Sequence, residues 1–153
     1  MAAAGLTPGG FYRHFESKQK VFEEAIEHAI DLMATSMQRT ASRGKRGLQS
    51  VIKDYLSDDF GSEVAAGCPF VALGSDLAPS SDEVRALTTQ GFRRMVSIIA
   101  DRLEDLPPDA ARNRALVMLS TMIGAVTMAI VVSDPARSKA ILQQARMHLT
   151  QAA

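Results

Sequence analysis

The sequence predicts an all-α protein, and three observations lead to that fold class. Apolar side chains recur every three or four residues along most of the 153 positions, which places them on one face of a helix. Residues that favour helix N-termini stand where these runs begin. No stretch alternates between apolar and polar residues for long enough to form a strand, and the chain contains no internal repeat.

The first long helix is expected at residues 17–41. Ser17 can cap its N-terminus, and apolar residues from Val21 to Met37 follow at helical spacing. Glutamate and aspartate occupy the opposite side, so this helix is amphipathic with one buried face. The basic, glycine-containing stretch SRGKRG ends the pattern, and a second apolar stripe predicts another helix at residues 46–59.

The middle of the chain is expected to hold a short helix and a long one. The short helix lies near residues 70–77 and is stopped by Pro79. Ser80 followed three residues later by Glu83 is a capping-box pattern, which predicts a helix at residues 81–105. A pair of prolines ends that helix.

Two further helices are expected at residues 109–132 and 135–150, the last one capped by Asp134 with a proline at its first position. The stretch 115–132 contains no charged residue, which brings it to the lower length limit of a transmembrane helix. It includes Gly124 and three hydroxyl residues, and no second segment is as apolar. We therefore expect burial in a core or in an oligomer interface, and no membrane contact.

The composition restricts the classes of function. Lysine plus arginine and aspartate plus glutamate both number 17, so any contact with nucleic acid has to come from a local basic patch. Cys68 is the only cysteine, which excludes an internal disulfide and favours a reducing compartment, the cytoplasm. The first fifteen residues lack the apolar core of a signal peptide.

No pattern of an enzyme or of a metal site is found in the sequence. His14, His28 and His148 lie far apart and do not have metal-ligand spacing. Cys68 has no base close to it in the sequence, and acidic residues lie singly on the expected helix faces. We therefore expect no metal, no cofactor and no catalytic site.

The stretch LTPGGFYRHF, residues 6–15, has an unusual composition for the start of a helix. Its two glycines each cost about 1 kcal/mol of helix stability relative to alanine. They also let backbone amides approach a ligand closely, and a helix N-terminus favours an anion. Tyr12, His14 and Lys18 can donate hydrogen bonds to phosphate oxygens, and Arg13 can bind guanine through two hydrogen bonds. The stretch therefore suits a DNA contact, and a short surface helix with core aromatics explains the same composition equally well.

The first 29 residues, MAAAGLTPGGFYRHFESKQKVFEEAIEHA, closely resemble the end of the helix-turn-helix and the following helix of TetR-type transcriptional regulators. Ala3-Ala4-Gly5 matches the turn of that family, and Ser17-Lys18 matches the start of the next helix. The later stretch GCPFVALGSDLAPSSDEVRA is similar to a segment of the family's ligand-binding domains. The resemblance therefore covers essentially the whole chain.

This resemblance implies a TetR-like fold in two parts. Residues 1–41 would be a remnant of the DNA-binding helix-turn-helix together with a connecting helix, and residues 42–153 a helical domain for ligand binding and dimerisation. In the first part, the family comparison places Thr7, Pro8, Gly9 and Arg13 against bases, and Gly10, Tyr12, His14 and Lys18 against phosphates.

The resemblance further implies a repressor that a small apolar effector releases from operator DNA. In the family, a first helix and most of a second precede the matching string. We therefore expect this chain, which begins inside that second helix, to bind operator DNA poorly or not at all. A dimeric helical module that binds a small molecule without binding DNA is the alternative function, and an all-α enzyme is a further one.

The effector pocket is expected between the helices at residues 48–60, 81–105 and 109–132. Methionine and aromatic side chains there suit a hydrophobic ligand. A position in the core explains each of these side chains as well. The pocket candidates are Met33, Cys68, Phe70, Leu73, Phe92, Met95, Met118 and Met122.

A homodimer is expected to form through the last two helices. Residues 115–132 hold too many apolar side chains for one buried face of a monomer, and a twofold partner would let the same patch cover itself. By the family resemblance, these two helices would form a four-helix bundle with the second subunit. The interface candidates are Ser120, Gly124, Thr127, Met128, Ile141 and Ala145.

Overall fold

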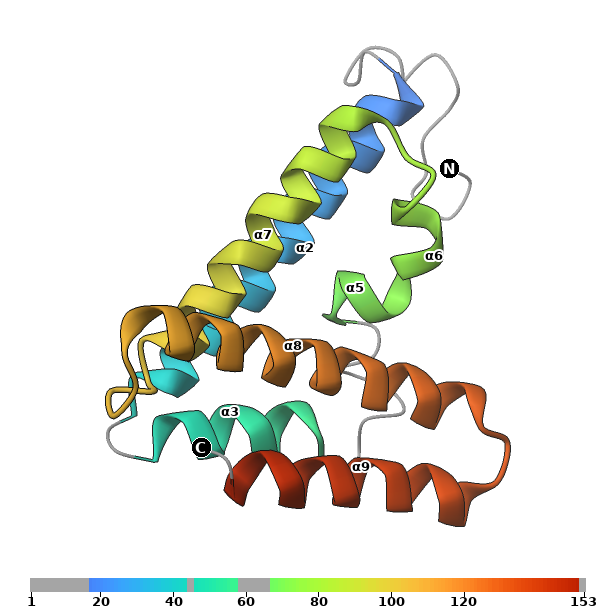
Figure 1. The fold of residues 1–153 in the computed structure, drawn as a ribbon. Coiled ribbons are helices and arrows are strands. Elements are labelled where there is room, and N and C mark those ends of the chain that lie inside the picture. Colours follow the sequence, from blue (N-terminus) through green and yellow to red (C-terminus); the bar gives the residue numbers. More distant parts are fainter. Residues whose placement is uncertain (1–16, 44–45, 58–66, 152–153) are drawn as a thin grey trace.

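The computed structural model describes residues 17–43, 46–57 and 67–151, and within these ranges the chain forms helices and no strand. The all-α fold that the sequence predicts is therefore confirmed (Figure 1). The helices are α2 (Lys18–Ala41), α3 (Gly47–Tyr55), α5 (Pro69–Ala72), α6 (Gly74–Leu77), α7 (Asp82–Ala100), α8 (Pro108–Val131) and α9 (Pro135–Gln151).

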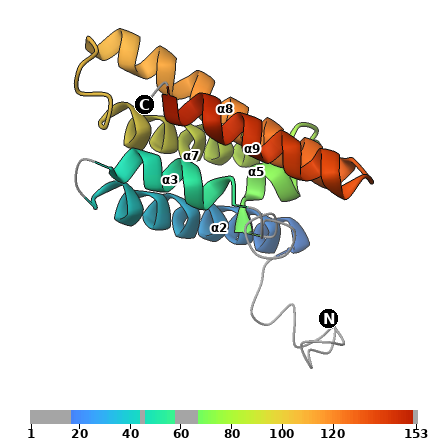
Figure 2. The same cartoon turned by 90° about the horizontal axis from the view of Figure 1, so that it is seen from below.

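Two pairs of long helices build the molecule. Helices α2 and α7 lie side by side and form the first pair (Figure 1). Helix α8 packs against α7 near the end of this pair, and α9 returns along α8. Helix α3 lies beside α2 and also contacts α9, so it bridges the two pairs (Figure 2). The short helix α5 contacts α8, and α6 contacts α7.

The apolar core lies between these two pairs. Leu119 and Met122 of α8 are fully buried in it, together with side chains from α2, α3, α7 and α9. None of the described polar or charged residues is buried, so the burial of apolar surface supplies most of the stabilisation. A smaller cluster near the start of α2 consists of Ile26, Ile30, Leu77 and Val84.

A glycine sets the distance between α2 and α7. A Cβ atom at Gly91 of α7 would overlap the side chain of Ile30 on α2, so only glycine fits without displacing that side chain. Nearby, Arg94 Nη1 lies 2.5 Å from Asp31 Oδ1 and joins the same two helices at the surface. Both charged side chains are about half exposed, so this ion pair stabilises the pairing only slightly. The close contact at Gly91 is the stronger constraint on the pairing.

Two of the three predicted helix caps are confirmed. The side chains of Ser17 and Asp134 accept hydrogen bonds from backbone N–H groups in the first turns of α2 and α9. The third prediction is wrong by one residue, because Ser81 rather than Ser80 caps α7. The hydroxyl of Ser80 donates instead to the carbonyl oxygen of Leu77 at 2.6 Å and closes the preceding turn.

The structure also corrects several helix bounds. The helix expected at residues 81–105 ends at Ala100, because the following backbone N–H groups bond three residues back and tighten the chain. This turn brings Leu103 into the core. The helix expected near residues 70–77 is interrupted at Leu73, which separates α5 from α6. Helix α3 ends at Tyr55, and the last two positions of its expected range lie outside the described residues.

Helix α8 is long and apolar enough, by length and composition, to cross a membrane. The core helix of a water-soluble protein passes the same test. One side of α8 forms part of the core, where seven of its residues are buried. The other side of α8 carries exposed apolar side chains, which are described below.

Candidate ligand cavity between α2 and α3

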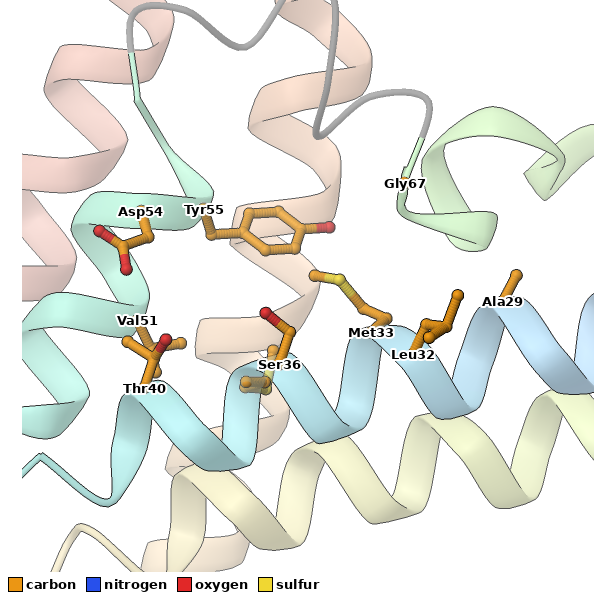
Figure 3. A pocket seen from close by; sticks show the side chains of 10 residues that line it. Ala29, Leu32, Met33, Ser36, Thr40, Val51, Asp54, Tyr55 and Gly67 are labelled. Atoms are coloured by element: carbon orange, nitrogen blue, oxygen red, sulfur yellow. The ribbon is translucent and has the colours of Figure 1, made fainter.

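A cavity of about 420 Å³ opens between α2 and α3 (Figure 3). The two helices come together at the turn that joins them, where a Cβ atom at Gly47 would overlap the backbone of Ala41. From that turn the helices run apart (Figure 1). The cavity lies in the wedge between them, so the close contact at Gly47 fixes its narrow end.

The wall of the cavity is a helical stripe from α2 facing the second half of α3. The α2 residues follow one another at spacings of three and one, which keeps them on one side of the helix. This stripe lies next to the stripe that enters the core, and Met37 belongs to both. The lining residues are Ala29, Leu32, Met33, Ser36, Met37 and Thr40 from α2, Val51, Asp54 and Tyr55 from α3, and Gly67.

Tyr55 forms the wall opposite α2. Met33 extends from α2 toward its ring (Figure 3). The Tyr55 hydroxyl donates a hydrogen bond to Cys68 Sγ at 3.0 Å. This bond holds the ring in place and connects the end of α3 with the start of α5. Burial, with a smaller effect from Cys68, raises the pKa of the Tyr55 phenol above its usual range. The tyrosine is therefore neutral at physiological pH and presents an aromatic surface.

The polar groups of the wall are few. Ser36 and Thr40 supply hydroxyl groups from α2, and Asp54 supplies a carboxylate from α3. Asp54 is exposed, which places its charge at the solvent-facing part of the cavity. The remaining lining side chains are apolar. A concave surface of this size and character suits a small, largely apolar molecule held by a few polar contacts.

The structure changes the location of the expected pocket. Of the eight predicted pocket residues, Met33 alone lines this cavity. Met95, Met118 and Met122 are fully buried in the core, because α7 and α8 pack closely where these side chains meet. These three side chains belong to the core of this structure, and their place in an effector pocket stays a prediction.

The other pocket candidates also pack against neighbouring side chains. Cys68 is buried and bonded to Tyr55. The rings of Phe70 and Phe92 meet edge to face, with centroids 5.8 Å apart, and both pack against the main core. Leu73 packs against the smaller cluster at the start of α2. None of these four residues lines the cavity between α2 and α3.

Most residues predicted to contact DNA lie outside the described residues. This holds for Thr7, Pro8, Gly9, Gly10, Tyr12, Arg13 and His14. Lys18 is the exception, and it is exposed as the first residue of α2.

The predicted dimer residues lie on α8 and α9 with different exposures. Ser120, Gly124 and Met128 are exposed on α8. Thr127 is half-buried, and its hydroxyl donates to the backbone of its own helix. Ile141 and Ala145 of α9 are half-buried and pack against the core. Large apolar side chains that the sequence-based assignment omitted are also exposed on these helices, namely Leu116, Val117, Ile130, Val131 and Met147.

Among the described residues, no group of three or more histidine, cysteine, aspartate or glutamate side chains could hold a metal ion. Among the described lining residues, no hydrogen bond joins a nucleophile to a base.

Comparison with protein families gives two matches along the chain. Residues 45–148 match the C-terminal domain of the LmrA/YxaF-like transcriptional regulators. Residues 1–25 match the bacterial regulatory proteins of the TetR family. The second match includes the start of α2, and the first includes α3 and most of the helices that follow it.

Two curated proteins of Mycobacterium tuberculosis are similar to this chain. One comes from strain H37Rv and the other from strain CDC 1551, and each is named an uncharacterised HTH-type transcriptional regulator. Each is 27% identical over 139 residues, which cover 86% of this chain and 71% of the relative. Together with the two family matches, these similarities show that the chain belongs to the TetR family of transcriptional regulators and is not an enzyme.

Proposed function

We propose that this regulator is a repressor whose affinity for operator DNA falls when a small, mainly apolar effector occupies the cavity between α2 and α3. The position of α2 carries the proposal. This helix supplies six of the ten lining residues, and it begins at Lys18, inside the stretch matched by the DNA-binding part of the family. An effector in the cavity therefore contacts the helix that continues directly from the DNA-binding segment.

The packing around α2 supports a mechanical link. On one side α2 borders the cavity, and on the other side it is fitted to α7 at Gly91. A molecule that separates α2 from α3 would therefore shift α2 together with α7, because the close fit at Gly91 resists sliding between them. Thermodynamic linkage requires that DNA in turn weakens effector binding by the same factor.

We also propose that the chain divides into two parts, which meet at the cavity between α2 and α3. Residues 1–41 would serve as the DNA-binding and connecting part, and residues 42–153 as the effector-binding and dimerisation part. The wall residues of α2 belong to the first part, and Asp54 and Tyr55 belong to the second. The cavity thus lies at the junction of the two parts, where occupancy can act on both. We place this regulator in the cytoplasm, with operator DNA as its partner.

The proposed dimer would use the exposed face of α8 together with α9. Leu116, Val117 and Val131 are each about half exposed or more on α8, and Met147 is half exposed on α9. Exposed apolar side chains gathered on one pair of helices are unfavourable in water and are typical of an interface. A twofold axis through this face would place two operator-contacting segments on one dimer, which suits operators with two half-sites.

The effector role is tested with a neutral hydrophobic dye, Nile red, and a variant that fills the cavity. Met33→Trp places an indole in the space next to Tyr55. We expect the natural protein to bind the dye and the variant to lose most of that binding. Leu106→Trp, a substitution at an exposed site that does not line the cavity, is the control. Equal dye binding by Met33→Trp and the natural protein would contradict the proposal.

The DNA role is tested by fluorescence anisotropy with the promoter of the neighbouring gene. The measurements use a version extended at the N-terminus by the helices that precede this stretch in the family. In that version, Lys18→Ala should weaken binding to all sequences alike and reduce the dependence on salt, because we propose that Lys18 contacts phosphate. Arg13→Ala should cost about 1–3 kcal/mol at one base position and relax the sequence preference there. Dye that fills the cavity should lower the DNA affinity of the extended protein. A DNA affinity that stays constant at saturating dye would contradict the link between the two sites.

A further inference from the structure

The described cavity wall contains a single charged side chain, and its charge is negative. Asp54 is the single side chain among the described lining residues that is charged at neutral pH, because the Tyr55 phenol stays protonated. The lining contains no lysine, arginine or histidine. An anionic ligand would therefore meet a carboxylate and no counter-charge, whereas a cation would gain a favourable Coulomb interaction.

The stretch of sequence that begins at Asp54 is acidic as well. From Asp54 to Val84 the chain holds seven acidic residues and no lysine, arginine or histidine. This run supplies Asp54, Tyr55 and Gly67 to the cavity wall. Of the four acidic residues of this run that the structure describes, Asp54 alone lines the cavity.

The basic residues closest in sequence to the lining lie outside the described cavity wall. Lys53, next to Asp54, lines a groove between α3 and α9. His28 and Arg39, next to Ala29 and Thr40, line a surface depression together with Arg94, and this depression borders the cavity because Leu32 and Ser36 line both. None of Lys53, His28 and Arg39 belongs to the described cavity wall. The carboxylate of Asp54 therefore acts on the cavity without a basic residue of the wall beside it.

The neutral part of the wall also suits an organic cation. The ring of Tyr55 borders the cavity although only 3% of the residue is exposed, and its hydrogen bond to Cys68 keeps the ring in position. Met33 and Met37 add polarisable thioethers. Aromatic surfaces attract weakly hydrated cations, and thioethers adapt to irregular apolar groups.

We propose that the cavity between α2 and α3 selects apolar organic cations, such as quaternary ammonium or phosphonium compounds, over anions of the same shape. The proposal rests on the proposed function, because it names the class of effector for the same cavity. Asp54 is the residue that determines the preference, and Tyr55 with the two methionines provides the apolar contact surface.

The test uses two ions of almost equal shape and opposite charge, tetraphenylphosphonium and tetraphenylborate, and measures their dissociation constants by calorimetry. We expect the cation to bind about tenfold more tightly than the anion. Asp54→Asn should weaken the cation about two- to fivefold and strengthen the anion by a similar factor. Glu104→Gln removes one negative charge at an exposed turn that does not line the cavity, and it should leave the ratio unchanged.

The outcomes separate this inference from the proposed function. If Nile red binds in a manner that Met33→Trp abolishes, but the two ions bind equally or the anion binds more tightly, the effector cavity stands and the charge preference is overturned. A cation preference that survives both Asp54→Asn and Met33→Trp would locate the cation elsewhere and would also overturn it. If neither ion nor Nile red binds, the proposed function fails together with the inference.

Discussion

Helices α2 and α8 have the same length, 24 residues, but the outer face of α2 is polar and that of α8 is apolar. Both bury one side in the core of the same chain. The outer side of α2 is polar, and Leu32 at the cavity is its one large exposed apolar side chain. The outer side of α8 carries Leu116, Val117 and three further large apolar residues. Helix α2 therefore leaves little apolar surface uncovered within one chain, whereas α8 leaves five large apolar side chains exposed, which the proposed dimer would cover.

The largest expected effect comes from a charge on the outer face of α8. A Cβ atom at Gly124 has no neighbour within 4 Å in the protomer, so Gly124→Arg leaves the fold of the single chain undisturbed. In a dimer through α8 it would bury two unpaired charges of the same sign, and we expect the dissociation constant to rise by at least about two orders of magnitude. Light scattering at micromolar concentration should change from dimer to monomer.

The matching change on α2 is Ala25→Arg, because Ala25 is also exposed. This variant should keep the oligomeric state of the natural protein, since the outer face of α2 is already polar. A dimer that persists in Gly124→Arg, or one that disappears in Ala25→Arg, would contradict the distinction between the two helices.

The second largest effect is expected at the close contact between Gly91 of α7 and Ile30 of α2. Gly91→Leu inserts a side chain where even a Cβ atom overlaps Ile30, and we expect the free energy of unfolding to fall by about 1–3 kcal/mol. Chemical denaturation gives this value. Ala86→Leu, at an exposed position of the same helix, should change it by much less. Similar losses in both variants would mean that the distance between α2 and α7 is not set at Gly91.

A smaller effect on stability is expected at the N-terminus of α2, which has a side-chain cap that α8 lacks. Ser17 accepts a hydrogen bond from the Lys20 backbone at 3.0 Å, whereas α8 begins after Pro107 with no side-chain cap. Ser17→Ala should therefore lower the free energy of unfolding by about 1 kcal/mol. Thr35→Ala, at an exposed position within α2, removes a hydroxyl that does not cap the helix and should change stability little. Thermal denaturation measures both variants, and an equal loss of stability in Thr35→Ala would contradict the role of Ser17 as a cap.

The smallest effect is expected for the ion pair between Asp31 and Arg94. Because both side chains are about half exposed, water and salt screen the pair, and its coupling energy should be below about 1 kcal/mol. A double-mutant cycle with Asp31→Asn and Arg94→Gln measures it. A larger coupling would mean that charge, and not the close fit at Gly91, holds α2 against α7.

The helices themselves could be predicted from the sequence because their signals are local. Apolar spacing and N-terminal residues such as Ser17 and Asp134 act within a few positions of the chain. The bounds were less accurate where packing decides them. The end of α7 at Ala100 depends on Leu103 entering the core, which involves residues distant in sequence.

The cavity could not be predicted for the same reason. Its place depends on the angle between α2 and α3, which the contact of Gly47 with Ala41 fixes. Residue type does not separate a methionine of the wall, such as Met33, from one of the core, such as Met95, because both suit apolar surroundings. The lining residues Leu32, Asp54 and Tyr55 were missed for lack of any local signal beyond helical spacing. The outer face of α8 was recognised in part, because an uncharged run is visible in the sequence itself.

The placement of Tyr55 has an optical consequence. The sequence contains no tryptophan and two tyrosines, Tyr12 and Tyr55, so ultraviolet fluorescence excited above the phenylalanine absorption band comes from these two rings. Tyr55 lies in the cavity wall with its hydroxyl held by Cys68, and a molecule that enters the cavity changes the surroundings of that emitter directly. The natural protein thus carries its own spectroscopic reporter of occupancy, and compounds can be screened without a dye, a label or DNA.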